Sequence, residues 1–474
     1  MADTIASLLA LWHIGLRELL FVTALLFALS GLDDLFIDFV FFGRTLWRRA
    51  TIYSRHPRAT AESLRRPDPA PIAIIVPAWD ESAVIGQMLA NLLDRLDYPR
   101  YRLFVGVYPN DPATAGAIAR VADHHVETVV CKAPGPTTKA DCLNHLWAAV
   151  LAHERRVGEA FKAIVLHDAE DVIHPQELWV YDALIPRFAM VQLPVLPLPD
   201  AGSRWISGHY ADEFAESHAK DLVVREALGA AVPSAGVATA IERGLLGRVA
   251  AIAGGQPFDA ACLTEDYELG HRLKALGGRA ALVRLKSADE RVVVATREHF
   301  PATFDAALRQ KTRWLIGIGL AGWDRLGWPG GLADRYMLLR DRKALLTALL
   351  TIVGYGVALL VLTDMLLRQL VPAMAQLPPL AGRGLKALLW LNAGLLLWRL
   401  AMRAAFTAHA YGPFEGIRAI PRAIIGNIIN AAAAWNAIVR YGSSVRGESR
   451  LHWDKTEHRY PDDTASDSVE PGRP

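Results

Sequence analysis

Apolar residues are concentrated in long runs towards both ends of the chain and in shorter runs between them. The first long run, residues 16–42, reaches the ~20 residues of a membrane-spanning helix only if it includes Asp33, Asp34 and Asp38. Carboxylates are costly inside a bilayer, so one interpretation ends the span near Leu32 and leaves the acids at the interface. In the alternative, they face a polar cavity or a neighbouring helix. No small-residue cleavage site follows, which predicts an uncleaved anchor.

Further apolar runs follow residue 300. Residues 344–362 and 385–402 each predict a membrane helix. Residues 314–328 mix tryptophans with apolar and charged residues, which is typical of an interfacial helix. Residues 423–441 contain three asparagines and fit an interfacial or bundle-buried helix better than a lipid-facing one. The pattern therefore predicts about three spans.

Between these regions, short β-branched runs alternate with helical periodicity. The pattern predicts strands at 71–79, 101–108, 126–132 and 162–168, and helices at 82–96, 115–124 and 138–154. Strands that alternate with helices indicate a mainly parallel sheet with right-handed crossovers. Ligands of such sheets bind at the carboxyl ends of the strands. The predicted fold class is α/β, with transmembrane and interfacial helices added to the sheet domain.

Composition and charge divide the chain further. Hydrophobic residues make up 52% and charged residues 21%, a combination that suggests a charged soluble domain joined to membrane segments. The net charge of +2 gives no indication of nucleic-acid binding. The three cysteines lack CxxC spacing, so we expect reduced thiols and no zinc site. The predicted segments are an N-terminal transmembrane anchor (1–43), a basic, proline-rich linker (44–70), a cytoplasmic sheet domain (71–300), interfacial helices (301–343), transmembrane and interfacial helices (344–441), and a cytoplasmic, largely disordered tail (442–474).

Basic residues gather directly after the first span. The positive-inside rule then places the N-terminus outside and the following domain in the cytoplasm. A second basic group after residue 439 keeps the far end of the chain on the same side as this domain. The first group consists of Arg44, Arg48, Arg49, Arg55 and Arg58.

Four short motifs carry the candidate chemistry: PAWDES (77–82), DAED (168–171), TED (264–266) and QKTRW (310–314). Each is weak alone, since an acidic doublet is usually a solvated turn. Together they occur in a fixed order, each at a predicted strand or helix end. In this set, over roughly residues 65–345, the chain resembles the membrane-embedded glycosyltransferase family 2 enzymes, which include cellulose, chitin and hyaluronan synthases.

The chain resembles the bacteriophage adsorption protein B family more closely still. This likeness lies in SGLDDLFIDFVFFGR, YPND, HDAEDVIHP and WDKTEHRYP. It implies a GT-A-like sheet domain in the bacterial inner membrane. Members often carry a further cyclic-di-GMP-binding domain, so regulation through a domain outside this chain is a further expectation.

The resemblance implies a metal site in DAED. A nucleotide sugar brings two phosphates, and Mg²⁺ or Mn²⁺ neutralises the departing diphosphate through oxygen ligands. By register with the family's DxD motif, Asp168 and Glu170 are the ligand pair. Asp171 is the rival of Glu170. We expect His167 to be a core histidine rather than a ligand.

The later motifs take their roles from the same resemblance. Asp266 matches the general base, which takes the proton of the acceptor hydroxyl in an inverting transfer. Thr264 and Glu265 would shape the acceptor end of the pocket. Gln310 and Trp314 would contact the acceptor or a sugar ring, although a tryptophan at a membrane interface needs no such role. Arg313 would pair with the diphosphate.

The nucleotide end departs most from the family pattern. Pro77 and Glu81 match the loop that frames the nucleotide, whereas Asp80 has no clear role. Asp111, in Tyr-Pro-Asn-Asp, stands where the family has an Asp-Asp-Gly turn and is a candidate for the uridine. Lys139 is a candidate for the diphosphate.

These expectations lead to one leading function and two alternatives. We expect transfer of a sugar, an N-acetylhexosamine, from a UDP-sugar to a growing exopolysaccharide, processive and coupled to secretion. Three spans are few for a complete channel, so an outer-membrane export partner is expected too. The alternatives are transfer of a single sugar to a lipid acceptor, and a non-catalytic phage receptor or scaffold with a glycosyltransferase fold.

Overall fold

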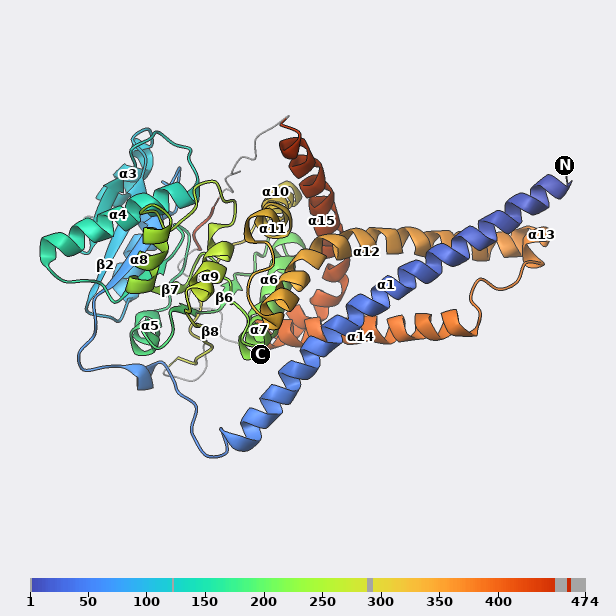
Figure 1. The fold of residues 1–474 in the computed structure, drawn as a ribbon, viewed down its shortest axis with the longest axis horizontal. Coiled ribbons are helices and arrows are strands. Elements are labelled where there is room, and N and C mark those ends of the chain that lie inside the picture. Colours follow the sequence, from blue (N-terminus) through green and yellow to red (C-terminus); the bar gives the residue numbers. More distant parts are fainter. Residues whose placement is uncertain (1, 122, 288–292, 448–457, 462–474) are drawn as a thin grey trace.

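A rod of long helices projects from an α/β domain (Figure 1). The computed structural model describes residues 2–121, 123–287, 293–447 and 458–461. The N-terminus lies at the tip of the rod, and the sheet lies at the opposite end of the molecule.

The described residues form a seven-stranded sheet and a separate two-stranded one. The strands are β1 (Ile72–Pro77), β2 (Tyr101–Val107), β3 (Val126–Val130), β4 (Ala163–Leu166), β5 (Met190–Gln192), β6 (Val195–Pro197), β7 (Thr239–Glu242), β8 (Ala280–Leu282) and β9 (Thr296–Glu298). The large sheet has the order β3-β2-β1-β4-β7-β5-β8, in which only β7 runs antiparallel to its neighbours. The predicted mainly parallel sheet is confirmed, and the four predicted strands are its first four.

Helices cover both faces of this sheet, and β1 is buried on both sides. Ile72, Ile74 and Val76 pack towards α2, whereas Ala73 and Ile75 pack towards α4 and α8. This two-sided burial explains the unbroken apolar run of the strand. The helices of the domain are α2 (Ile85–Arg95), α3 (Pro112–Ala119), α4 (Lys139–Val157), α5 (Glu177–Leu184), α6 (Ile206–Glu216), α7 (Leu222–Ala227), α8 (Arg243–Ile252), α9 (Glu265–Ala275), α10 (Phe304–Leu315) and α11 (Ala321–Leu326), with a short 3₁₀ turn η1 (Glu62–Leu64) and two π-helical turns, η2 (Ser217–Asp221) and η3 (Ile316–Leu320).

Several helix boundaries differ from the sequence prediction, and the helix expected over 115–124 is observed as α3 over Pro112–Ala119. The helix expected over 82–96 begins only at Ile85, and its N-cap is Val84, without a side-chain bond. The interfacial helix expected over 314–328 is broken into the end of α10, η3 and α11. The periodicity therefore located the helices but not their exact ends.

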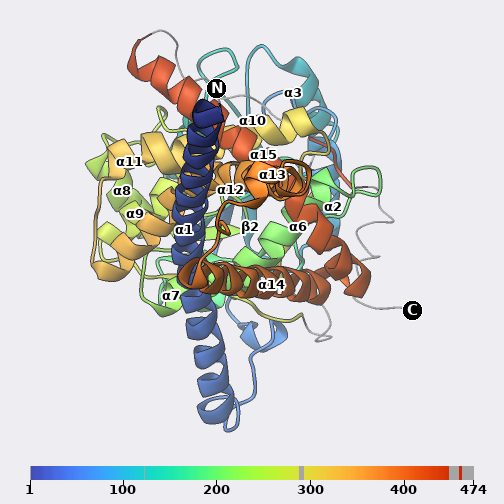
Figure 2. The same ribbon diagram turned by 90° about the vertical axis from the view of Figure 1, so that its right-hand side faces the viewer.

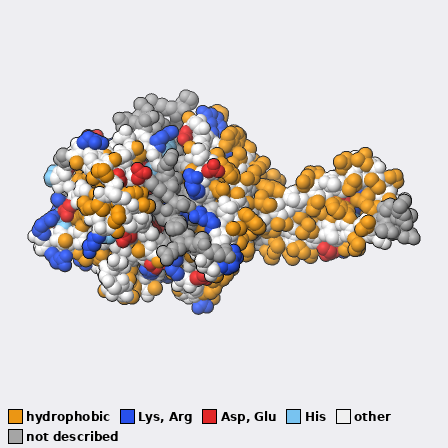
Figure 3. All heavy atoms as spheres, turned by 90° about the horizontal axis from the view of Figure 1, so that it is seen from above, with side chains coloured by type: hydrophobic (Ala, Val, Ile, Leu, Met, Phe, Trp, Pro, Cys, Tyr) orange, Lys and Arg blue, Asp and Glu red, His pale blue; other side chains and the backbone are white. Residues whose placement is uncertain are grey.

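The rod is built from α1 (Ala2–Thr51), α12 (Leu332–Leu370) and α14 (Arg383–Tyr411), and the short α13 (Pro372–Ala375) lies between α12 and α14. Among the described residues, these three long helices are the ones long and apolar enough to cross a membrane. Hydrophobic side chains cover the rod, whereas charged side chains gather on the sheet domain (Figure 3). α12 leads away from the domain and α14 returns beside α1 (Figures 1 and 2). This arrangement suits a protein that passes through the membrane three times.

The three aspartates of α1 contact neighbouring helices. α1 does not end near Leu32 but continues to Thr51. Asp33 and Asp34 form ion pairs with basic residues of α12, and Asp38 accepts a hydrogen bond from Trp398 of α14. The acids therefore face neighbouring helices, and the end of the membrane span near Leu32 stays a prediction.

The last long helix, α15 (Pro413–Val445), has two different faces. Large apolar residues at intervals of three or four are exposed, namely Phe414, Ile417, Ile420, Ile424 and Ile428. The opposite face consists mainly of small buried residues and packs on α6 and α10. The helix is thus amphipathic, and the placement of residues 423–441 at the membrane interface stays a prediction. The predicted tail begins within α15, and its expected disorder falls largely on residues 448–457 and 462–474, which lie outside the described part of the chain.

Candidate active site

A cavity of ≈ 60 Å³ lies at the carboxyl ends of β1, β2 and β4. Strand order reverses between β1 and β4, the position at which open α/β sheets bind ligands. Five of the predicted site residues line it: Pro77, Glu81, Lys139, Asp168 and Glu170. Two aromatic residues that the sequence reasoning did not single out, Trp79 and Tyr108, also line it and pack edge to face.

The loop after β1 is held by the loop after β2. Asp80 adopts a left-handed conformation, with φ of 54°, which aspartate tolerates better than most residues. Its backbone N–H donates to Asp111 Oδ2 at 2.6 Å. The other oxygen of Asp111 accepts the N–H of Thr114 and caps α3. Asp111 thus holds the loop that carries Glu81. The contribution of Asp80 to this contact is its backbone N–H.

The carboxylates of DAED point in different directions. Asp171 is buried and accepts a hydrogen bond from His167 Nδ1 at 2.6 Å, while His167 Nε2 reaches Glu177 at 2.8 Å. Burial disfavours the charged imidazole, but the charge of Glu177 and the hydrogen bonds to both carboxylates outweigh it and raise the pKa of His167 to about 10. Asp171 also accepts the backbone N–H of Asp168. The rival ligand is therefore engaged in the core, whereas Asp168 and Glu170 face the cavity.

Lys139 connects DAED with TED. Its Nζ lies 2.6 Å from Asp168 Oδ1. Burial raises the pKa of Glu265 to about 7, as does the neighbouring charge of Asp266, while Lys139 opposes both. Burial also raises the pKa of Asp266, against the opposing charges of Lys139 and, more weakly, Arg313. The fold therefore brings DAED and TED within electrostatic reach of Lys139, and the arginine of QKTRW within reach of Asp266.

The remaining TED and QKTRW residues lie where two helices meet. Thr264 is buried against the backbone of η3, so closely that a Cβ on Gly317 would lie 2.5 Å from its side chain. Trp314 packs on Tyr210 and Phe214 of α6 and does not line the described cavity. Gln310 has a buried side-chain oxygen without a hydrogen-bond partner among the described residues. Packing against these aromatic residues is thus enough to explain why Trp314 is half-buried, without a sugar ring as its partner.

Two further titratable residues reach the site, and the sequence reasoning did not assign either. Burial raises the pKa of Glu298, at the end of β9, well above its usual value. The negative charges of Asp171, Glu170 and Asp168 raise it further. His458 reaches the cavity from the far end of the chain and lies between Glu81 and Glu170. The family-like stretch WDKTEHRYP contains His458 and was the only indication in the sequence.

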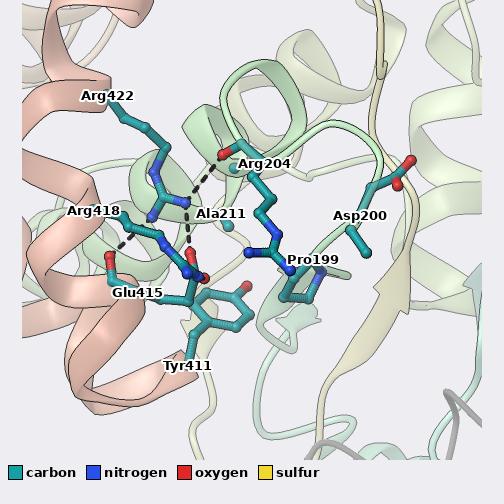
Figure 4. A pocket seen from close by; sticks show the side chains of 10 residues that line it. Pro199, Asp200, Arg204, Ala211, Tyr411, Glu415, Arg418 and Arg422 are labelled. Atoms are coloured by element: carbon teal, nitrogen blue, oxygen red, sulfur yellow. Dashed lines mark hydrogen bonds and ion pairs between the residues drawn. The ribbon is translucent and has the colours of Figure 1, made fainter.

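A second cavity, of ≈ 170 Å³, lies where α14 meets α15. Arg204, Arg418 and Tyr411 converge on it, while Arg422 turns back to Glu415 and to the backbone of Arg204 (Figure 4). These side chains supply both donors and acceptors of hydrogen bonds next to the exposed apolar face of α15.

Comparisons with known proteins agree with this geometry. Residues 69–317 match a family model described as glycosyltransferase like family 2. The chain is 39% identical, over 97% of its length, to bacteriophage adsorption protein B of Escherichia coli strain K12 and, equally, to bacteriophage N4 adsorption protein B of E. coli O157:H7. It spans 64% of the length of these relatives. In the solved structure of the mannosyltransferase PcManGT from Pyrobaculum calidifontis, in complex with GDP-Man and Mn²⁺, the similarity is one of fold: the TM-score is 0.50 at 18% identity, covering 92% of this chain and 99% of that one.

Proposed function

We propose, from the premise that this chain belongs to glycosyltransferase family 2, that it transfers a sugar from a UDP-sugar to a growing exopolysaccharide with inversion. The observation that carries the proposal is the convergence of Asp168, Lys139 and Asp266 at the carboxyl edge of the sheet. This convergence also argues against the non-catalytic scaffold, which has no need for the acidic set beside a half-buried lysine.

Each of these residues has a role in the proposed reaction. The Asp266 carboxylate takes the proton of the acceptor hydroxyl as that oxygen attacks the anomeric carbon. Lys139 and Arg313 hold the negative charge of the departing diphosphate. Thr264 and Glu265 border the acceptor, and Gln310 and Trp314 shape the far side of its path. Pro77, Glu81 and the loop that Asp111 braces frame the nucleotide.

The residues present fit a divalent cation. Asp168 and Glu170 both line the cavity and offer carboxylate oxygens, the donor type that Mg²⁺ and Mn²⁺ prefer. Asp171 is a poorer candidate because its carboxylate is already bonded to His167. When bound, such a cation supplies charge neutralisation for the diphosphate.

The setting supports a product that enters or crosses the membrane. The three candidate spans and the exposed apolar side chains of α15 support a sheet domain that lies next to a bilayer, which we propose to be the bacterial inner membrane. We further propose that the product is an N-acetylhexosamine polymer, that its synthesis is processive, and that a partner protein exports it. The second cavity favours one alternative, a single transfer to a lipid acceptor, because its arginines lie beside the exposed apolar side chains of α15.

The test uses membranes that contain the full chain, a panel of UDP-sugars, and Mg²⁺ or Mn²⁺. UDP release above that of Asp266→Asn is expected with at least one sugar. If no sugar gives such release, both transferase hypotheses, polymer synthesis and transfer to a lipid acceptor, are wrong. A product ladder on a gel supports polymer synthesis, whereas a single lipid-extractable sugar supports the lipid acceptor.

A further inference from the structure

The larger of the two cavities, the corner cavity, lies where the membrane helix α14 turns into α15. Its volume is ≈ 170 Å³, and it is bounded by this corner, by α6 and by the loop that follows β6. The described residues that line it share no member with those that line the active-site cavity. The corner cavity is therefore a separate site, to which the transfer of a sugar from a nucleotide assigns no role.

Two hydrogen-bond donors that line the corner cavity have no partner among the described residues. The Tyr411 hydroxyl is buried and makes no hydrogen bond within the described ranges. The Arg204 guanidinium forms no hydrogen bond or ion pair there either, although its backbone carbonyl accepts a hydrogen bond from Arg422. The side chains of Arg204 and Tyr411 converge on the cavity (Figure 4). Because a buried hydroxyl is normally hydrogen-bonded, Tyr411 points to a ligand that supplies acceptor atoms.

The other arginines of the corner cavity are already bound to carboxylates. Glu415 accepts hydrogen bonds from Arg418 and Arg422. Arg422 also donates to both oxygens of Asp212, at 3.0 and 2.6 Å. Among the described residues that line the cavity, Arg204 is thus the guanidinium without a carboxylate partner. A ligand with a single negative charge would complete this set.

Large apolar side chains extend from the corner cavity along α15. Phe414 and Ile417 are 76% and 66% exposed, and Ile420, Ile424 and Ile428 continue the same face of the helix. α14, which ends at the cavity, is one of the three candidate membrane spans. A ligand whose acceptor group enters the cavity can therefore lay an apolar chain along this face.

These features together match a phospholipid with one negative charge. Guanidinium groups bind phosphate oxygens strongly, and the cavity has room for a group larger than several ordered waters. A zwitterionic headgroup fits less well, because its ammonium group needs a free carboxylate. Glu415 is engaged by arginines, and Asp200 accepts the N–H of Gly202 and points away from Arg204 in Figure 4.

We propose that the corner cavity binds phosphatidylglycerol of the bilayer, with Arg204 and the Tyr411 hydroxyl as donors to its phosphate. Its acyl chains lie on the exposed apolar face of α15. The bound lipid joins the end of α14 to the loop after β6, because the two donors come from these two segments. This lipid is neither the donor nor the acceptor of the sugar, so the proposal does not depend on the transferase activity.

The experiment measures lipid binding to the delipidated full chain in detergent by native mass spectrometry, without UDP-sugar. Wild type is expected to bind phosphatidylglycerol at least about tenfold more tightly than phosphatidylcholine, the effect of one hydrogen bond to a charged group. Arg204→Ala is expected to lose this preference, and Tyr411→Phe to reduce it. Arg204→Lys keeps the charge without the planar fork. It is expected to retain part of the preference, and it tests the proposal should the alanine variant fail to fold.

The matched control is Arg248→Ala, at an exposed arginine of α8, which is expected to bind phosphatidylglycerol as wild type does. The proposal is overturned if Arg204→Ala keeps the wild-type preference, or if wild type binds both lipids equally. Tighter binding of a polyprenyl phosphate than of phosphatidylglycerol, lost in Arg204→Ala, would also overturn it and would assign the cavity to a lipid acceptor. Failure of the transferase proposal is a separate result, because it is measured as UDP release.

Discussion

Three neighbouring carboxylates in DAED have different environments, and the difference could not be derived from their spacing. Asp168 and Glu170 reach the cavity, while Asp171 is bonded to a buried histidine. The register with the DxD motif favoured Asp168 and Glu170 as the ligand pair but left Asp171 as the rival of Glu170. The partner Glu177, from the next helix, could not be foreseen, because it depends on how α5 packs.

Removal of Asp171 should therefore affect folding rather than metal binding. Asp171→Ala leaves His167 buried with one carboxylate partner, and loss of one member of a buried pair costs about 3–5 kcal/mol. We expect a clear drop in the thermal unfolding temperature of Asp171→Ala, with Mn²⁺ affinity retained at low temperature. Glu170→Gln should give the opposite result, a small change in stability and weaker Mn²⁺ binding. If Asp171→Ala instead abolished Mn²⁺ binding in folded protein, Asp171 would be the ligand.

Lys139 should set the pH at which Asp266 works. Its positive charge opposes the rise in the pKa of Asp266 that burial causes. Lys139→Met removes this charge, so the pKa of Asp266 rises further and its carboxylate forms only at higher pH. The acid limb of the kcat/KM profile should therefore move to higher pH, measured as UDP release, along with a lower maximum. Lys132→Met, at an exposed lysine, is the control and should leave the limb in place.

At the scale of elements, the hydrophobic pattern located the strands of the parallel half of the sheet to within about two residues. It found β1, β2 and β4 because each is a mostly buried apolar run, and β3 because its valines are β-branched. It found none of β5 to β9, which are short and interrupted by loops and helices. The π-helical turn η3 was not predictable either, since it lies against Thr264 of TED, a contact between distant parts of the chain.

Gly317 in η3 should be sensitive to a single methyl group. A Cβ there would lie 2.5 Å from Thr264, whereas a Cβ on Gly319, in the same turn, meets nothing within 4 Å. Gly317→Ala should push η3 away from TED at a cost of about 1–3 kcal/mol, the usual range for overpacking. UDP release should fall by at least about tenfold in Gly317→Ala and change little in Gly319→Ala. Equal activity of the two variants would show that the contact between η3 and TED is not required.

At the scale of the whole molecule, buried charges join the rod to the sheet domain. Lys220 of η2 lies 2.5 Å from Asp38 of α1 and 2.6 Å from Glu216 of α6, and all three are buried. The sequence pattern predicted the sheet domain and the spans separately. It could not predict the contact between Asp38 and Lys220, or the contacts of His458 with the active site. Both join residues that are about 180 or more positions apart in the sequence.

The buried ion pair between Asp38 and Lys220 should be replaceable by two apolar residues. Asp38→Ala leaves the Lys220 ammonium with one carboxylate fewer in a buried setting, and breaking a buried pair in this way costs about 3–5 kcal/mol. Replacing both charges with apolar residues of similar size is often neutral or stabilising, and Glu216 keeps Arg399 as a partner. Thermal unfolding of the full chain in nanodiscs should therefore show a lower transition for Asp38→Ala and recovery towards wild type for Asp38→Leu with Lys220→Met. A double variant no more stable than the single one would mean that the Asp38–Lys220 pair itself holds the rod to the domain, and that apolar packing cannot replace it.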